Sequence, residues 1–532
     1  MRIANRKYKN IFFRTNFSFF NYLLFFFLIV SCTTTNSTSI EITIDKDATY
    51  QKIEGFGASD AWRTQFVGAN WPKEKKEKIA ELLFSKDLDA SGNPKGVALS
   101  MWRFYIGAGS TEQGKKSGIK NEWRRAESFI DAKGNYDWNK QKGQQWFLQK
   151  AKSYGVDSFL AFSIAAPVQW SLNGKAYNGD SKDGNINLQE DKFDDYAGFM
   201  VNFLEHFKSE GIKFDYLSPI NEPQWDWEKK TQEGTPATNK DILKLTKLID
   251  EEIKKKKLST KIVVAEAADL RWLYSDFGKP KRGNQIDYFF NNKKQIKNLD
   301  NTISGHSYFT TWPIDTLIEV RQKLHKKLKN HPNLNYWQSE FCILEKNDDI
   351  SGGNKRDLGI NTALYVARVM HADLTLANAS SWQWWTAISN ADYKDGLIYI
   401  DTGKEKEMHN LDALKFNGNF HDSKLLWAFG NYSRFVRPGM VRVSSKINET
   451  KSLKETYKNL MISTYLDSKT SKIVSVIINY SNKDKTVHFN NFKLEKMYET
   501  STNKNLEKIS FNSNQTVIKA KSINTLIGII NN

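Results

Sequence analysis

Apolar and polar positions alternate along most of the chain in two different periods. Between residues 53 and 430, short apolar runs of strand length are separated by stretches with helical periodicity. The clearest helical stretch follows residue 193, where apolar residues recur on one face, and Gly211 ends it. Eight apolar runs are candidate strands, at residues 53–59, 97–105, 156–163, 214–220, 261–266, 303–308, 334–340 and 379–385.

This alternation of strands and helices predicts the fold class. Strands that alternate with helices form parallel βαβ units. Eight such units favour a closed (β/α)8 TIM barrel over an open sheet. We therefore expect an α/β protein with a catalytic barrel over residues 53–430.

After the barrel the pattern changes to short runs rich in β-branched residues with polar turns between them. These runs predict a small β-sandwich side domain over residues 431–532. An alternating segment before the barrel, within residues 40–52, is expected to add a strand to it. The candidate strands of the side domain are residues 461–466, 472–480, 486–489, 515–519 and 522–530.

The N-terminus has the pattern of an export signal. A basic stretch without acids precedes an apolar run that is short for a membrane-spanning helix and ends at Cys32. The end of the run resembles a bacterial lipobox, so residues 1–31 are interpreted as a lipoprotein signal peptide, Cys32 as the lipidated residue and residues 32–39 as a tether. We expect a bacterial lipoprotein at the outer membrane, on the cell surface or in the periplasm. An ordinary signal peptide or an uncleaved anchor is the alternative.

Charge, cysteine count and the lack of certain motifs argue against several other classes of function. The net charge is +18, but lysines lie in mixed runs such as residues 73–78, which favours solvated helix faces over nucleic-acid binding. Cys342 is the only cysteine besides Cys32, so no intrachain disulfide is expected. The eight histidines lack metal-binding spacings, and no glycine-rich nucleotide motif follows the first strand. We expect no cofactor, no metal and a monomer.

Two glutamates stand where a barrel of this kind carries its chemistry. Glu222 follows the fourth candidate strand and Glu340 ends the seventh. The active sites of such barrels lie at the carboxyl ends of the strands. A pair of carboxylates there is what glycoside hydrolysis requires, one as proton donor and one as nucleophile.

The surrounding residues add a resemblance to a family. The segment 218–223, with Asn221-Glu222-Pro223, and the segment 337–340 resemble glycoside hydrolase family 30, as do segments 54–59 and 426–439. The resemblance covers nearly the whole chain after the signal. It implies a retaining O-glycosyl hydrolase in which Glu222 is the acid/base and Glu340 the nucleophile.

The resemblance also implies roles for other residues. Asn221 would bind the sugar 2-hydroxyl, Tyr308 would orient Glu340, and Arg103 would hold Glu340 ionised. Trp384 would form the floor of the subsite for the cleaved sugar. Further candidates for substrate contact are His306, Trp385, Trp170 and Asp60, followed by Trp382, Trp225 and Trp62.

The resemblance implies a polysaccharide substrate with β-glycosidic bonds. Loops at residues 123–127, 221–227 and 232–238 most resemble the endo-β-1,6-galactanase branch of the family. A glucuronoxylanase, for which the loop cations Arg271, Lys279 and Lys281 are candidates, and a β-1,6-glucanase are alternatives. So are a transglycosylase, a metal-dependent hydrolase and, in another class, a non-catalytic glycan-binding surface lipoprotein.

Overall fold

The computed structural model describes residues 39–179, 183–291, 296–404, 408, 410–448, 451–511 and 515–530. The chain separates into two compact units, residues 1–38 and residues 39–532. The predicted signal peptide, Cys32 and all of the tether except Ser39 lie outside the described residues. Within the described part of the chain, no helix has the length and apolar character to cross a membrane.

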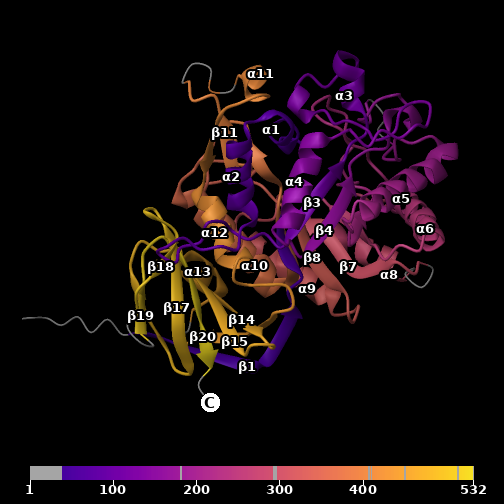
Figure 1. Ribbon diagram of the computed structural model, residues 1–532. Helices are drawn as coiled ribbons and strands as arrows, with labels where there is room; N and C mark the ends of the chain where they lie inside the picture. Colours follow the sequence, from indigo (N-terminus) through magenta and orange to yellow (C-terminus); the bar gives the residue numbers. More distant parts are fainter. Residues whose placement is uncertain are drawn as a thin grey trace, which may run out of the picture. The chain divides into compact units, whose positions relative to one another are not determined.

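Eight parallel strands close into a barrel, as the sequence predicts (Figure 1). Closure is made by the first and last strands, where Gly55 pairs with Ser381 and Ala58 with Trp384. At Gly57 a Cβ atom would lie 2.8 Å from the carbonyl oxygen of Met101, so only glycine permits this approach of the first two strands. The strands are β2 (Gly55–Ser59), β3 (Met101–Ile106), β4 (Ser158–Ser163), β5 (Tyr216–Ser218), β6 (Lys261–Ala267), β7 (Leu299–His306), β8 (Asn335–Glu340) and β9 (Ala379–Trp384).

Helices connect successive strands and bury their apolar faces against the barrel. The clearest periodic stretch forms α5, which buries Phe193, Tyr196, Phe199, Phe203 and Phe207. The main helices are α1 (Thr64–Asn70), α2 (Lys73–Phe84), α4 (Lys142–Ser153), α5 (Phe193–Ser209), α6 (Asn239–Lys255), α7 (Arg271–Tyr274), α8 (Gln285–Asn291), α9 (Ile314–Leu328), α10 (Ile360–Leu376) and α12 (Lys424–Ser433).

The loops at the carboxyl ends of the strands carry structure that the periodicity did not predict. After β9 a small three-stranded sheet forms from β10 (Thr386–Ser389), β11 (Gly396–Asp401) and β12 (Asn419–Asp422). Short helices α3 (Ser110–Gln113) and α11 (Leu411–Leu414) lie in these loops. Such short segments have too few residues to display a period.

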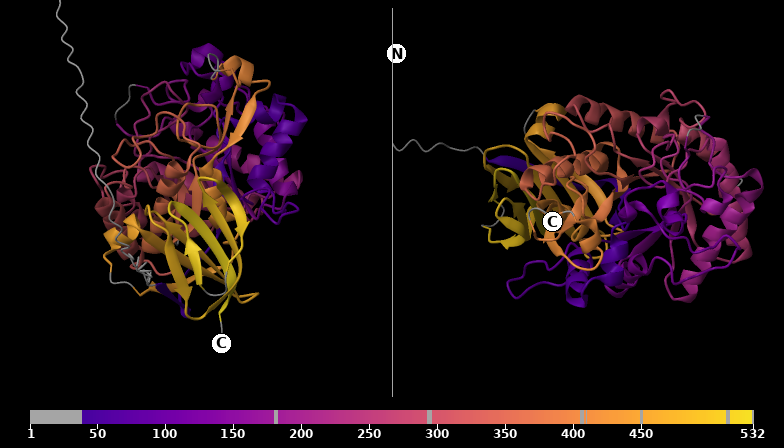
Figure 2. Two further views of the ribbon diagram at one scale, coloured as in Figure 1. Left: turned by 90° about the vertical axis from the view of Figure 1, so that its left-hand side faces the viewer. Right: turned by 90° about the horizontal axis from the view of Figure 1, so that it is seen from above.

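The second domain is β-rich, and Figures 1 and 2 show its C-terminal strands gathered together with β1 beside them. Its nine strands form one sheet in the order β18-β17-β20-β15-β14-β13-β1-β16-β19. Residues of well-separated strands, such as Ile473 of β15 and Val487 of β16, share one hydrophobic core, so the sheet bends over itself as a sandwich does. The strands are β1 (Ile40–Lys52), β13 (Val441–Ile447), β14 (Leu460–Asp467), β15 (Lys472–Asn479), β16 (Lys485–Phe489), β17 (Phe492–Ser501), β18 (Lys504–Ile509), β19 (Gln515–Ile518) and β20 (Ser522–Ile530).

The N-terminal strand joins this domain as expected. β1 pairs antiparallel with β13 and parallel with β16. Helix α12 connects the barrel to the β-rich domain, where the Asn431 side-chain amide donates to Thr500 Oγ1 at 2.7 Å and the hydroxyl of Thr525 donates to the Asn431 carbonyl at 2.8 Å. These hydrogen bonds fasten the helix to the sheet of the β-rich domain, beside the barrel rather than across its catalytic end.

Candidate active site

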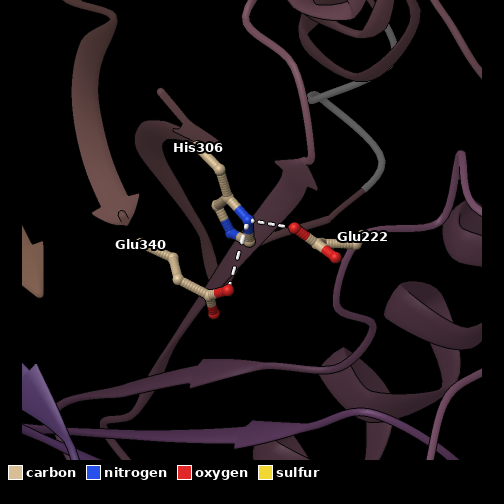
Figure 3. A group of neighbouring side chains, drawn as sticks. All are labelled: Glu222, His306 and Glu340. Atoms are coloured by element: carbon tan, nitrogen blue, oxygen red, sulfur yellow. Dashed lines mark hydrogen bonds and ion pairs between the residues drawn. The ribbon is translucent and has the colours of Figure 1, made fainter. Parts of the chain in front are cut away.

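The two predicted glutamates meet at the mouth of the barrel. Glu340 is the last residue of β8, and Glu222 follows β5 by four residues. One carboxylate oxygen of each lies within 4.8 Å of the other and of a ring nitrogen of His306 (Figure 3). Glu222 has a φ of +47°, a strained value for a side-chain-bearing residue, and its N–H donates to the Glu266 carbonyl at 3.0 Å.

Three neighbours surround the Glu340 carboxylate. Arg103 Nη1 donates to Oε2 at 2.6 Å and the Tyr308 hydroxyl donates to Oε1 at 3.1 Å. His306 Nδ1 lies 3.8 Å from Oε1. Burial raises the pKa of Glu340 above its ordinary value and the nearby Glu222 charge adds to this, while His306 and Arg103 oppose it.

His306 links three carboxylates. Its Nδ1 lies 2.9 Å from Glu222 Oε1 and its Nε2 lies 2.9 Å from Glu266 Oε2. Burial alone lowers the pKa of His306, but Glu340, Glu222 and Glu266 together raise it to about 9. The three carboxylates therefore favour the imidazolium form, in which both ring nitrogens donate.

This protonation state bears on metal binding. Glu222, His306 and Glu340 have the spacing that a metal ion needs among the described residues. A metal binds the lone pair of a neutral imidazole, and both nitrogens of His306 already face carboxylates. The cluster therefore fits proton transfer better than metal coordination.

Glu266 is a member of the site that the sequence reasoning missed. It lies in β6, fully buried, and its Oε2 accepts from Arg103 at 3.2 Å, His306 and Ser339 at 2.8 Å. Burial alone raises the pKa of Glu266, but Arg103 and His306 lower it to about 2. The sequence offered one signal for Glu266, its position at the end of the fifth barrel strand. A single glutamate at a strand end is weak evidence for a site residue.

Arg103 connects the acid residues through its fixed fork. Its Nη1 bonds Glu340, while Nη2 donates to Asn221 Oδ1 at 2.9 Å and to Glu266. The guanidinium lies 3.7 Å from the ring centroid of Phe162, so the aromatic ring packs against it and restricts its orientation. The predicted residues Arg103, Asn221, His306 and Tyr308 are thus all brought together with the two glutamates.

A family comparison agrees with this geometry. A family model described as O-Glycosyl hydrolase family 30 matches residues 39–399. The chain belongs to this family. The resemblance drawn from the sequence is confirmed, and the protein is an O-glycosyl hydrolase.

Other members of family 30 and related folds extend the comparison. An endo-β-1,6-galactanase of Hypocrea rufa is 24% identical over 378 residues, which is 68% of this chain and 69% of that protein. A solved structure described as a conserved exported protein from Bacteroides fragilis is 39% identical, with a TM-score of 0.86 over 91% of this chain and 99% of that chain. The catalytic domain of a family 30 xylanase C from Talaromyces cellulolyticus shares the fold, with 19% identity and a TM-score of 0.64 over 92% and 99%.

The predicted aromatic contacts need correction. Trp384 is 0% exposed and its Nε1 donates to the Asp395 carbonyl at 2.7 Å, so it offers no face to a sugar. The next residue, Trp385, is 8% exposed and lines a cavity. Trp382 is also fully buried and donates to Asp373 at 2.8 Å. Side chains alternate in direction along a strand, and this alternation separates Trp385 from its neighbours.

Two further predicted residues lie away from the glutamates. Trp170, in a short 3-10 helix, packs edge-on against Phe199 of α5, with ring centroids 6.1 Å apart. Asp60 is fully buried and its Oδ1 accepts the N–H of Tyr105 at 2.9 Å. Burial raises the pKa of Asp60 to about 8.

The loop cations proposed for a uronate are engaged elsewhere. Arg271 pairs with Asp269, and Lys279 lies 3.7 Å from Asp226. Lys281 lines a cavity beside α6 that contains neither catalytic glutamate. The structure therefore does not direct these three cations toward the glutamates.

A cavity of about 950 Å³ is lined by residues of the loops after β3, β5, β8 and β9, and its lining includes neither glutamate. Cys342 lines it, and the Tyr308 hydroxyl that bonds Glu340 lies 3.8 Å from the Cys342 sulfur. Trp385, Leu344 and Tyr393 supply apolar and aromatic wall. The volume suits a segment of an oligosaccharide rather than a single small ion.

Proposed function

We propose that this family 30 enzyme cleaves β-glycosidic bonds by double displacement, with Glu340 as nucleophile and Glu222 as acid/base. The observation that supports this is the approach of their carboxylate oxygens to within 4.8 Å. Retaining glycosidases hold their two carboxyl groups about 5–5.5 Å apart, whereas inverting enzymes need about 6.5–9.5 Å to admit a water. The observed spacing favours the retaining route.

The neighbours suit these two roles. Arg103 and Tyr308 fix both oxygens of Glu340, which aims the carboxylate at the anomeric carbon. Attack forms a bond from Glu340 to that carbon, while Glu222 protonates the departing glycosidic oxygen. In the second step Glu222 takes a proton from water, and the water releases the sugar from Glu340.

We propose that Asn221 binds the sugar. Its Oδ1 already accepts from Arg103, which turns the amide nitrogen away from the guanidinium. That nitrogen can donate to a sugar hydroxyl beside the anomeric carbon, an interaction that strengthens in the transition state. Neither the nucleophile nor the acid/base needs a cofactor for its step.

For the substrate we propose β-1,6-linked galactan, cleaved within the chain. The relative from Hypocrea rufa that carries this activity in its name is 24% identical over more than two thirds of both proteins. The loop segments quoted above point the same way. Glucan- and xylan-degrading neighbours share the fold at lower identity and serve here as comparison substrates.

We also propose that the chain is exported and held by a lipid on Cys32, as a monomer that meets polysaccharide outside the cytoplasm. The basic and apolar N-terminal pattern supports this. A relative described as exported, 39% identical over 91% of this chain, supports the export step. Labelling with a radioactive fatty acid, with and without Cys32→Ser, tests the anchor, and labelling that persists in the variant contradicts it.

The mechanism is tested with Glu340→Ala, Glu222→Ala and the control Glu228→Ala, which alters an exposed glutamate of the same loop. Both site variants should lose at least about four orders of magnitude in kcat/KM on β-1,6-galactan, because each removes a group that acts in the transition state. Azide should restore turnover to both and yield glycosyl azides of opposite anomeric configuration. Near-normal activity in either site variant would contradict its role.

The substrate is tested by product profiles on β-1,6-galactan, β-1,6-glucan and glucuronoxylan. A ladder of galacto-oligosaccharides is the expected result. Cleavage of glucan or xylan alone would overturn the galactan proposal but keep the mechanism. No cleavage of any polysaccharide or short β-glycoside would favour the non-catalytic glycan-binding alternative.

A further inference from the structure

A row of aromatic rings leads outward from the catalytic glutamates. Each ring centroid lies within 6.4 Å of the next, and we call the row the aromatic strip; in outward order it consists of His306, Tyr308, Phe309, Trp225, Trp272 and Phe277. Its inner end touches the nucleophile, because the Tyr308 hydroxyl donates to Glu340. Its middle is tied to the other glutamate, because the N–H of Trp225 donates to the Glu222 carbonyl at 3.2 Å. The strip is therefore continuous with both glutamates.

The outer rings of the strip are exposed although they are apolar. Tyr308 and Trp272 are 4% and 5% exposed, whereas Phe309 is 37% and Phe277 47% exposed. Among the described residues one other phenylalanine, Phe416, is as exposed, and it follows α11 in a different loop. Exposed apolar side chains that lie together mark a binding surface.

The backbone that carries both exposed rings is strained. The φ of Phe309 is +58° and that of Phe277 is +38°, in the left-handed region that favours glycine. A phenylalanine there costs free energy, and an exposed ring recovers little of it by packing. Strain of this kind gathers at sites that bind a ligand. A ligand on the two rings would account for both positions.

Arg271 fixes the two exposed rings relative to each other. Its guanidinium lies 4.1 Å from the ring centroid of Phe277, and its Nη2 donates to the Phe309 carbonyl at 3.4 Å. Its Nε donates to Asp269 Oδ1 at 2.9 Å, which holds the guanidinium in place. The outer part of the strip is therefore ordered before any ligand arrives.

The middle of the strip is fixed by a second arginine. Arg282 Nη1 donates to the Gln224 carbonyl at 3.0 Å and to Asp226 Oδ1 at 2.7 Å. The Gln224 side chain returns a hydrogen bond to the Arg282 carbonyl at 2.9 Å. Trp225 lies between these two clamped residues. A surface ordered in advance loses less entropy when it binds.

The position of the strip indicates which part of a glycan it meets. A pyranose has a face of C–H groups that packs against an aromatic ring, while its hydroxyls remain at the edge. As acid/base, Glu222 would protonate the glycosidic oxygen, so the departing sugar leaves past the loop of Glu222. Trp225 belongs to that loop, and Phe277 lies in the loop after the next strand, β6.

We propose that the aromatic strip binds the leaving part of the glycan, with the first sugar beyond the bond on Phe309 and Trp225 and the following sugar on Phe277. The class of ligand is a chain of β-linked pyranoses that continues past the leaving sugar. This rests on the proposed glycosidase function and deepens it, because such a surface favours bonds that have sugars on both sides.

The first test is a binding titration, which needs no turnover. Full-chain Glu340→Gln protein, with folding checked by circular dichroism, is titrated with β-1,6-galactobiose and β-1,6-galactotetraose, and the tetraose should bind more tightly. Adding Phe277→Ala should weaken the tetraose roughly 2- to 10-fold, the range expected for one aromatic contact. Phe277→Leu, which keeps an apolar side chain without a ring face, should weaken it as well. The control Phe416→Ala removes an exposed ring outside the strip and should change nothing.

The same titration separates this proposal from the choice of sugar. If the parent binds β-1,6-gluco- or xylo-oligosaccharides instead, the galactan proposal fails, and Phe277→Ala is measured on the series that binds. Unchanged affinity in that variant would overturn the strip. Binding of octyl β-galactoside or phosphatidylcholine vesicles, but of no oligosaccharide, would also overturn it in favour of an apolar partner.

A second measurement fixes the side of the bond. β-Galactosyl fluoride carries no sugar on the leaving side, so Phe277→Ala in the otherwise unchanged enzyme should lower kcat/KM on the tetraose and leave that on the fluoride unchanged. Equal losses on both substrates would contradict a leaving-side role. If the unchanged enzyme turned over neither substrate, the glycosidase proposal would fail, and the titration would still decide whether the strip binds a glycan.

Discussion

Replacing Glu266 by glutamine is expected to disable the site without removing either catalytic glutamate. The change keeps the shape of the side chain and deletes the charge that Arg103 and His306 share. Because both partners are buried, losing one of their counter-charges is costly, and only Glu340 and Glu222 would remain to balance them. His306 would then lose its proton more readily, and the hydrogen bonds that it donates to Glu222 would weaken.

The expected loss of stability follows from the pKa of Glu266, which is lowered from 4.5 to about 2. This depression corresponds to about 3 kcal/mol of stabilisation. It is present above pH 4.5 and is lost as the pH falls through about 2. The raised pKa of His306 has the opposite sign, so its contribution is complete below 6.5 and is lost as the pH rises through about 9.

Two measurements check this reasoning. Urea unfolding between pH 5 and 6.5 should give Glu266→Gln a free energy of unfolding about 3 kcal/mol below that of the unchanged protein, with a smaller difference near pH 9. The kcat/KM on β-1,6-galactan should fall on the order of 10²-fold at pH 6, since Arg103 and His306 lose the partner that holds them and a small misplacement of catalytic groups costs about that much. Its alkaline limb should also move to lower pH.

The control is Asp401→Asn, in a carboxylate that also pairs with an arginine and a histidine but lies in β11. Its Oδ2 is 2.7 Å from Arg356 and 2.9 Å from His421. This variant should lose stability and keep the pH profile of catalysis. If Glu266→Gln left that profile unchanged, or if both variants changed it equally, Glu266 would be a structural residue only.

Three further outcomes are expected. Tyr308→Phe removes the 3.1 Å hydrogen bond to Glu340 and should lower kcat/KM roughly 10- to 150-fold, which is the free energy of a hydrogen bond to a charged group expressed as a rate ratio. A change under about twofold would refute the orienting role. The acid limb of the kcat/KM profile should have its midpoint above pH 4.5, because burial raises the pKa of Glu340 and the nucleophile is protonated below it; a midpoint under 4.5 contradicts this. Glu233→Gln should lower the free energy of unfolding in urea by about 1–3 kcal/mol, since this fully buried carboxylate accepts hydrogen bonds from Tyr105 and Ser110. Unchanged stability would contradict its role in holding the loop after β5.

The sequence by itself determined the barrel and predicted that Glu222 and Glu340 lie at its mouth. Eight apolar runs of strand length, separated by helical periods, have few solutions other than closed parallel strands, and all eight runs overlap observed strands. Glu222 and Glu340 could be placed because Glu222 comes two residues after the fourth run and Glu340 ends the seventh, and the carboxyl ends of parallel strands meet at one end of a barrel. The same reasoning supplied Arg103 and Tyr308 once the family was recognised.

Only the tertiary structure decided which side chains share that space. Glu266 ended a predicted strand, but its contacts with Arg103 and His306 depend on the strained backbone at Ala265 and Glu266, with φ of +93° and +43°, which no period encodes. Trp384 and Trp385 differ by one position, and the direction of the strand at its end buries one and turns the other to the cavity. The cavity lined by Cys342 and Trp385 is assembled from loops far apart in the sequence, and the paths of such loops are set by packing rather than by local pattern.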